Sequence, residues 1–114
     1  MAGRINRGEI WLCTFNSPDK RRPVVVLTRQ DVIRLLNSVT IAPITSTIRG
    51  APSEVIVGVD DGLKHDSAVN LDHVQTVEKT RLRTFVGSLN PHKMRQVCRA
   101  LATATGCASP ANVD

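Results

Sequence analysis

Strand-like segments fill most of this chain, and its one long helical pattern follows them all. Between Arg7 and Leu89, β-branched or apolar segments alternate with clusters of turn residues, which predicts a series of short strands. From Asn90 onward, apolar residues recur at steps of three and four, which predicts an amphipathic helix. Because strands followed by a single helix bury their apolar face under that helix, we expect an α+β domain.

The strand boundaries follow the apolar segments and their breakers. The expected strands are Arg7–Phe15, Arg22–Thr28, Val39–Thr45, Glu54–Val59, Ser67–Val77 and Leu82–Leu89, with a short helix or turn over Arg29–Asn37. Pro43 has no backbone N–H to donate to a neighbouring strand, so we expect it at an edge or a bulge. Curled strands capped by the helix would form a small, half-open antiparallel barrel.

The C-terminal helix has recognisable ends. Asn90 is a typical N-cap residue, Pro91 fits the first helical position, and Gly106 fits the C-terminal stop. The apolar face of this helix is predicted to consist of Met94, Val97, Cys98, Leu101 and Ala102.

The length of 114 residues suits a single domain over 1–114, with loose termini at 1–6 and 107–114. No apolar run approaches the ~20 residues that cross a membrane, and the first residues lack the apolar core of a signal peptide. We therefore expect a cytoplasmic protein that has no membrane association.

The cysteines are widely spaced in the sequence. Cys13, Cys98 and Cys107 fit reduced thiols better than a disulfide framework, and Cys13 and Cys98 lie in apolar patterns typical of small core residues. Neither the cysteines nor the histidines have metal-ligand spacing, so we expect no metal site and no cofactor.

The charge balance points to an acidic partner. Lys and Arg number 15 against 10 Asp and Glu, which gives a net charge of +5 and suits a polyanion such as nucleic acid. The aromatic residues are Trp11, Phe15 and Phe85, all within apolar strand patterns, and we expect them in the core. Stacking on bases is therefore not available, and any nucleic-acid binding must rest on charge and hydrogen bonds.

Three cations stand at the mouth of a strand that reads as buried, in the stretch "DKRRPVVVLT". Pro23 keeps Arg22 extended, so the position of Arg22 is fixed while its guanidinium is free to fork two hydrogen bonds onto a phosphate. The same residues also fit a gatekeeper role, in which charges flank an aggregation-prone strand. These ten residues alone favour the gatekeeper.

Two further stretches combine polar groups with strand ends. In "PITST", the hydroxyls of Thr45, Ser46 and Thr47 could hold a phosphate or could bond their own backbone in an ordinary turn. In "SAVNLDHV", strand alternation places Asn70 and Asp72 on one face, which fits either a functional site or a sheet face open to water.

Taken in order, these segments resemble the MazF/PemK family of toxin endoribonucleases. The resemblance covers most of the chain, and it is the set of motifs that is specific rather than any one of them. The matching motifs are "RGEIW" at Arg7–Trp11, "RRPVVVL" at Arg21–Leu27, "PITST" at Pro43–Thr47, "SEVIV" at Ser53–Val57 and "DSAVNLDHVQTV" at Asp66–Val77.

The resemblance implies an SH3-like barrel, a homodimer and metal-independent, sequence-specific cleavage of single-stranded RNA. It also implies neutralisation by a MazE-like antitoxin whose acidic C-terminal segment covers the RNA groove. The resemblance implies that Arg22 and Thr45 are catalytic, and Asp72 matches an acidic residue that some branches of the family use in catalysis. Residues expected to contact RNA are Lys20, Arg21, Ser46, Thr47, Arg49 and Asn70.

The chain departs from the family pattern at two places. Asn70 stands where one branch has an arginine, so that branch's acid–base scheme does not carry over. The segment Asn16–Lys20 is shorter than in many relatives, so the RNA contacts usually made there must come from elsewhere or be missing.

Two other functions remain open from the sequence. A CcdB-like toxin shares this fold and poisons a protein target such as DNA gyrase, but the ending "LATATGCASPANVD" lacks the aromatic–isoleucine end expected of it. A non-catalytic SH3-like binding module would present an exposed aromatic groove, for which this chain has few aromatic residues.

Overall fold

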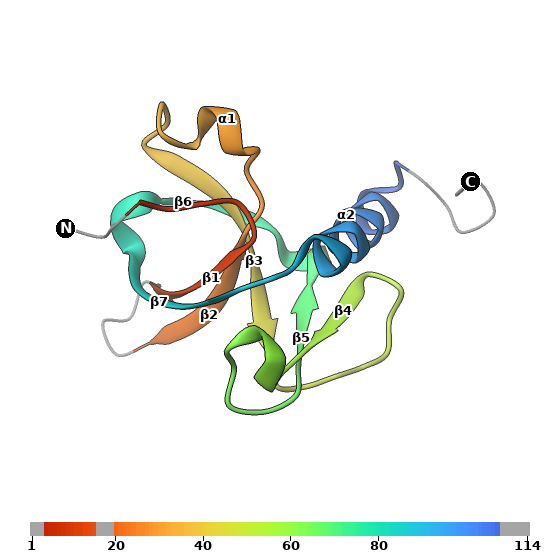
Figure 1. Cartoon of the computed structure of the whole chain (residues 1–114). Helices are drawn as coiled ribbons and strands as arrows, with labels where there is room; N and C mark the ends of the chain where they lie inside the picture. Colours follow the sequence, from red (N-terminus) through yellow and green to blue (C-terminus); the bar gives the residue numbers. More distant parts are fainter. Residues whose placement is uncertain (1–3, 16–19, 108–114) are drawn as a thin grey trace.

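The computed structural model of this chain describes residues 4–15 and 20–107 (Figure 1). The strands are β1 (Glu9–Thr14), β2 (Arg21–Val26), β3 (Ser38–Thr45), β4 (Glu54–Val57), β5 (Ser67–Asn70), β6 (Gln75–Glu78) and β7 (Leu82–Ser88). The helices are α1 (Gln30–Ile33) and α2 (Pro91–Thr105), with the 3₁₀ turns η1 (Val59–Asp61), η2 (Leu71–His73) and η3 (Lys79–Arg81).

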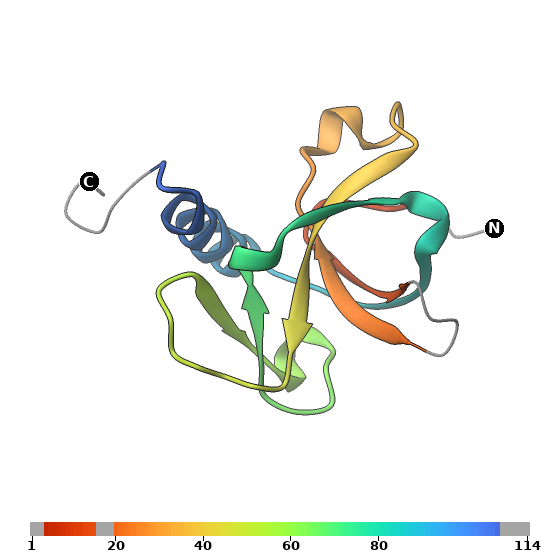
Figure 2. The ribbon, with the colours of Figure 1, turned by 180° about the vertical axis from the view of Figure 1, so that it is seen from behind.

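All strand pairs are antiparallel, and β3 is the centre of the sheet. The order is β4-β5-β3-β2-β1-β7, and β6 pairs with the first half of β3. Figures 1 and 2 show β1, β2, β3, β6 and β7 curling into a barrel, while β3 continues out of it to join β4 and β5 beside α2. The expected α+β architecture, a half-open barrel with one C-terminal helix, is confirmed.

Two apolar cores lie on opposite sides of the same strands. Within β2, Val24 and Val26 enter the barrel core with Trp11, whereas Val25 enters the second core under α2. The second core contains Val97 of α2. Because successive side chains of a strand point to opposite faces, the unbroken apolar run of β2 is explained by burial on both sides.

The capping of α2 agrees with the sequence. The Asn90 side chain accepts a hydrogen bond from the Lys93 N–H at 2.8 Å, and Gly106 ends the helix with φ +74°. The prediction that Cys98 is a core residue is wrong: its side chain is exposed, with Sγ 3.2 Å from Nη2 of Arg7. Successive side chains on an α-helix point about 100° apart. Because Val97 points into the core, the next residue, Cys98, points away from it.

The long strand predicted over Ser67–Val77 is also wrong. β5 ends at Asn70, whose side chain accepts a hydrogen bond from the Asp72 N–H at 3.0 Å, and the chain turns through η2 before β6 begins. An Asn side chain that accepts from the backbone N–H two residues later competes with the hydrogen bonds between strands. The strand therefore ends at Asn70, although apolar residues follow it.

The expectation that Pro43 lies at a sheet edge or a bulge is not met. It lies opposite Val24 in the central strand β3, between Ile41, where pairing with β6 ends, and Ile44, where pairing with β5 begins. The missing N–H therefore falls where β3 changes partner along one side, so the ladder accommodates a proline in a central strand.

The prediction that Phe85 is a core residue is wrong. Its side chain is 52% exposed on the edge strand β7, and its ring meets Trp11 edge-on with centroids 5.8 Å apart. Trp11 is buried and Phe15 partly buried, as expected.

The N-terminal segment is held in place from Ile5 onward, contrary to the loose terminus expected over 1–6. Ile5 is 7% exposed in the barrel core, and the Asn6 N–H donates to Oε1 of Glu9 at 2.7 Å. The remaining predictions for 1–3, 16–19 and 108–114 lie outside the described residues.

Candidate active site

Arg22 and Thr45 lie at the same end of two neighbouring strands. The pairing of β2 with β3 ends at Val24 and Pro43. Two residues beyond that pair, Arg22 runs along β1 and Thr45 runs along β5. Two predicted catalytic residues, 23 positions apart in the sequence, therefore come from neighbouring strand ends.

The backbone of Arg22 is held by pairing with β1, while its side chain is exposed. Its cross-strand partner is Cys13, which is fully buried. Burial raises the pKa of the Cys13 thiol, an effect that the positive charge of Arg81 opposes. Cys13 is thus a neutral packing residue, and Arg22 lies on the part of β2 that is anchored to β1.

Thr45 is oriented by a local hydrogen bond. Its Oγ1 accepts from the Thr47 N–H at 3.1 Å, so the hydroxyl hydrogen of Thr45 remains available to donate to a bound phosphate. The turn predicted as the ordinary alternative therefore exists, and it holds the hydroxyl in place. Ser46, Thr47 and Arg49 follow in the loop 46–52 and are exposed.

One face of the sheet next to Thr45 packs under α2, and the opposite face carries both polar and apolar side chains. Val55, Val57 and Val69 face α2, whereas the other face carries the paired positions of Thr45, Glu54, Ile56, Ala68 and Asn70. We call these five positions the open face. Thr45, Ala68 and Ile56 are cross-strand neighbours, and Asn70 is paired with Glu54.

Asp72 lies away from this pair within one chain. Its Oδ2 accepts a hydrogen bond from Ser53 Oγ at 2.5 Å, at the start of β4 and next to α2. Thr45 is paired with Ala68, which lies two residues, or about 7 Å, before the end of β5 at Asn70, and Asp72 follows in the turn η2. The structure therefore places Arg22 and Thr45 at neighbouring strand ends, whereas Asp72 lies beyond the far end of β5.

Lys20, Arg21 and Arg22 are all exposed. Among residues 4–15 and 20–107, the ion pairs join Arg29 to Asp31 and Lys93 to Asp61, so the three cations have no carboxylate partner within that part of the chain. Exposed arginines in such an arrangement are suited to bind phosphate oxygens. In the described part of the chain, no group of three or more His, Cys, Asp or Glu residues is placed to hold a metal ion.

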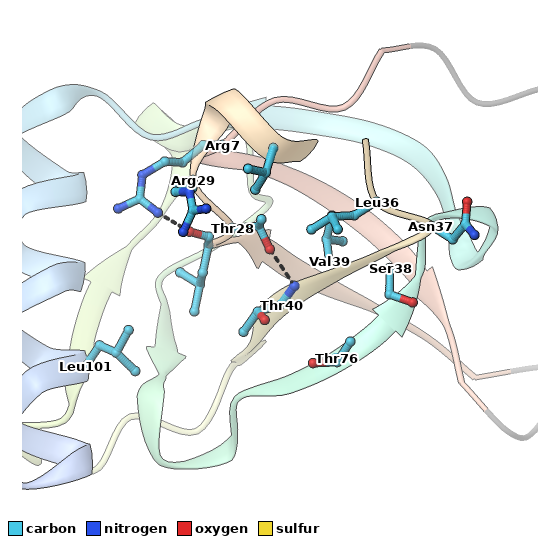
Figure 3. A pocket seen from close by; sticks show the side chains of 12 residues that line it. Arg7, Thr28, Arg29, Leu36, Asn37, Ser38, Val39, Thr40, Thr76 and Leu101 are labelled. Carbon is cyan, nitrogen blue, oxygen red and sulfur yellow. Dashed lines mark hydrogen bonds between the residues drawn. The ribbon is translucent and has the colours of Figure 1, made fainter. Parts of the chain in front are cut away.

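A groove lies at the other end of β3 from Thr45, between α1 and α2 (Figure 3). Its lining includes Leu27, Leu36, Thr40 and Leu101, and Thr28 Oγ1 accepts from the Thr40 N–H at 2.7 Å. None of the predicted site residues lines this groove. The candidate active site, formed by strand ends and a loop, is therefore separate from this groove.

Sequence reasoning missed two residues that organise this surface. Ser53 is buried and bonds Asp72, while Glu54 binds the backbone of the loop 46–52. A carboxylate directly after the breakers of "RGAPSE" is the only signal that could have pointed to Glu54.

Comparison with known proteins places this arrangement in a family. The family model that describes the PemK-like, MazF-like toxins of type II toxin–antitoxin systems matches residues 6–105. The chain belongs to this family.

Relatives with the MazF name cover almost the whole domain. The chain is 43% identical over 102 residues to the probable endoribonuclease MazF5 of Mycobacterium tuberculosis, covering 89% of this chain and 93% of that protein. The M. tuberculosis toxin MazF-mt6 superposes with a TM-score of 0.80 at 36% identity, covering 86% of this chain and 96% of the other.

A mycobacterial endoribonuclease solved with its cognate antitoxin has a TM-score of 0.83 at 28% identity, covering 94% of this chain and all of the other. These matches do not favour the gyrase poison or the binding module. No helix in the described part of this MazF-family chain is long and apolar enough to cross a membrane.

Proposed function

We propose that this protein is a toxin endoribonuclease that cuts single-stranded RNA at specific sequences without a metal ion. The observation that carries the proposal is the match to the MazF-like toxin family over residues 6–105, in a chain that places Arg22 and Thr45 at the ends of the neighbouring strands β2 and β3. Curated relatives that bear the endoribonuclease name support it.

The proposed reaction is an internal transesterification. The ribose 2′-oxygen forms a bond to phosphorus, its proton passes to a base, and the bond to the 5′-oxygen breaks as that oxygen gains a proton. The products are a 2′,3′-cyclic phosphate and a free 5′-hydroxyl. Negative charge develops on the phosphoryl oxygens, so preorganised donors there lower the barrier by several kcal/mol.

Arg22 and Thr45 supply the donors that this reaction needs. Arg22 offers two parallel N–H donors to the phosphoryl oxygens, and Thr45 donates its hydroxyl hydrogen to one of them or to the reacting group. Because the pKa of an arginine side chain exceeds about 12, charge stabilisation suits Arg22 better than proton abstraction.

The structure changes what we propose for Asp72. The sequence left it either to transfer a proton or to orient Arg22, but its carboxylate is bonded to Ser53 at the other end of β5. Within one chain, this geometry favours a role in holding the start of β4 over a role in proton transfer.

The proposed partners follow from the same assignment. We infer a homodimer in the cytoplasm that is held inactive by a MazE-like antitoxin, whose acidic C-terminal segment covers the RNA surface. Lys20, Arg21 and Arg49 would attract both the RNA and that acidic segment. A mycobacterial neighbour solved with its cognate antitoxin supports this regulation.

Incubation with RNA in EDTA tests the proposal. Wild type, Arg22→Ala and Thr45→Ala are incubated with mixed single-stranded RNA, and product ends are read by primer extension. Arg34→Ala is the matched control, because Arg34 is exposed after α1 and belongs to no proposed contact. We expect discrete cuts by the wild type and the control, and loss of the cuts in the two site variants.

The opposite result separates the alternatives. Intact RNA with every protein, together with capture of gyrase on the immobilised chain, would support the protein-poisoning toxin. Binding of RNA without any cut would support the binding module.

A further inference from the structure

Glu54 opens the edge strand β4, and its side chain lies on the open face. Its carboxylate oxygen Oε1 accepts hydrogen bonds from the backbone N–H groups of Arg49 at 3.1 Å, Gly50 at 2.9 Å and Ala51 at 3.4 Å. The Glu54 N–H donates to the carbonyl of Ala51 at 3.0 Å. One residue therefore closes the last turn of the loop 46–52 through both its side chain and its backbone.

The backbone of the loop is shaped to receive this carboxylate. Gly50 has φ +75°, in the left-handed region, and a Cβ added there would meet nothing within 4 Å. Glycine is therefore needed for its conformation and not for space. A left-handed residue within such a turn makes successive N–H groups converge, which creates a concave site for an anion. In this chain the anion is the side chain of Glu54.

The neighbouring residue anchors this turn to the rest of the domain. Ser53 donates from Oγ to Asp72 at 2.5 Å, and its carbonyl accepts from the Leu71 N–H at 3.0 Å. Ser53 is buried, and the Leu71 side chain lies in the core under α2. Ser53 thus fixes the root of the loop, while Glu54 fixes the turn that carries Arg49.

We propose that Glu54 is a positioning residue for RNA binding, which acts by holding the loop 46–52 in one conformation. This inference rests on the proposed function, since the loop carries Ser46, Thr47 and Arg49. The direction in which RNA affinity changes when Glu54 is removed distinguishes a positioning role from a purely electrostatic one. Removing a carboxylate raises the net positive charge and by itself strengthens RNA binding. Releasing the loop weakens binding, because the free loop must be ordered each time RNA binds.

The test measures RNA affinity and turnover separately. Affinity is measured by fluorescence anisotropy with a mixed-sequence 2′-O-methyl RNA, which lacks the nucleophile and is bound but not cut. Turnover is measured with the unmodified RNA. We expect Glu54→Ala to weaken binding about tenfold, with kcat changed less than twofold, because the amides of the loop lose their shared acceptor. Glu54→Gln keeps an oxygen at this position and should stay within about threefold of the wild type.

Two further variants complete the design. Glu78→Ala removes a carboxylate from the exposed position at the end of β6 and should leave binding unchanged or tighter. Glu54→Ala should weaken binding less in an Arg49→Ala background than in the wild type, because part of its effect acts through Arg49.

Binding by Glu54→Ala as tight as that of the wild type, or binding by Glu54→Gln as weak as that of the alanine variant, would overturn the inference. Amide hydrogen exchange of Gly50, measured without RNA, tests the loop contact independently of the proposed function. Exchange at Gly50 should be faster in Glu54→Ala than in the wild type. If the wild type neither binds nor cuts RNA while Gly50 remains protected by Glu54, the proposed function fails and the loop contact stands. Equal exchange of Gly50 in both proteins removes the basis of the inference.

Discussion

At the scale of single residues, the chemistry of Arg22 depends on the shape of its head group. Lysine carries the same charge, but it is a point donor and has no planar fork. We expect Arg22→Lys to lower the cleavage rate about 100-fold and Arg22→Ala at least as much, as for the loss of one preorganised donor. The free energy of unfolding should change by less than about 0.5 kcal/mol, since Arg22 is exposed.

Single-turnover cleavage in EDTA and urea unfolding measure the two quantities. Near-normal cleavage by Arg22→Lys would mean that charge alone suffices and that the fork has no role. A large loss of stability in the same variant would instead make Arg22 a structural residue.

The thiol of Cys13 predicts a dependence of stability on pH. Burial raises its pKa in the folded state above the unfolded value of about 8.5. Below about pH 8.5 both states are protonated and the thiol has no effect. As the pH rises further, the unfolded state loses its proton first, so the free energy of unfolding falls. The fall between about pH 7 and pH 9.5 should be smaller in Cys13→Ala, as measured by urea unfolding under reducing conditions.

The roles of residues were predictable only where the chain itself restricts the backbone. Pro23 and the apolar run after it were enough to fix Arg22 at a strand start. The position of Asp72 could not be predicted, because it depends on Asn70 capping a turn instead of continuing a strand. Glu54 was missed for a similar reason: three backbone amides converge on it only once Gly50 takes a positive φ.

At the scale of elements, a partly buried ion pair joins η1 to the first turn of α2. Oδ2 of Asp61, which is 5% exposed, accepts from Lys93 Nζ at 3.1 Å and from the Gly58 N–H at 2.9 Å. We expect Lys93→Met to lower the free energy of unfolding by about 1–3 kcal/mol, since a buried carboxylate loses a partner.

Lys64→Met is the matched control, because Lys64 is exposed in the loop after η1. It should change the free energy of unfolding by less than about 0.5 kcal/mol in the same urea titration. Equal losses in both variants would show that the Asp61 contact contributes nothing.

Elements with a clear period were predicted well, and the misses share a cause. The helix α2 was located from its spacing and caps, and β2 from its unbroken apolar run. The strand over Ser67–Val77 was predicted too long because the alternation of apolar residues does not show where a side chain forms a hydrogen bond with the backbone and ends the strand. The burial of Phe85 was overestimated because an edge strand and a central strand have the same alternation.

At the scale of the whole molecule, the two cores should unfold together. Trp11, the sole tryptophan, reports on the barrel core, whereas far-UV circular dichroism reports mainly on α2 and the second core. Since β2 and β3 contribute to both cores, neither core can lose its packing without the other. We expect coincident urea transitions by the two signals. Separate midpoints would show that α2 detaches first.

The distribution of charge predicts how RNA binding responds to salt. Each phosphate contact on a single strand contributes roughly 0.7 to the slope of log affinity against log salt. Changing both Lys20 and Arg21 to Gln should therefore reduce the slope by about 1.4. Thr45→Ala, which removes no charge, should leave the slope unchanged. Anisotropy titrations with 2′-O-methyl RNA at several salt concentrations measure it.

The alternation of two cores along β2 also has an evolutionary consequence. Inserting or deleting one residue between Arg22 and Leu27 would exchange the side chains that face the barrel with those that face α2. Length can therefore vary in the connecting loops, whereas this stretch can evolve only by substitution. Arg22, the proposed catalytic arginine, is thereby kept at a constant position relative to the core, while the loops that would set substrate preference can change without displacing it.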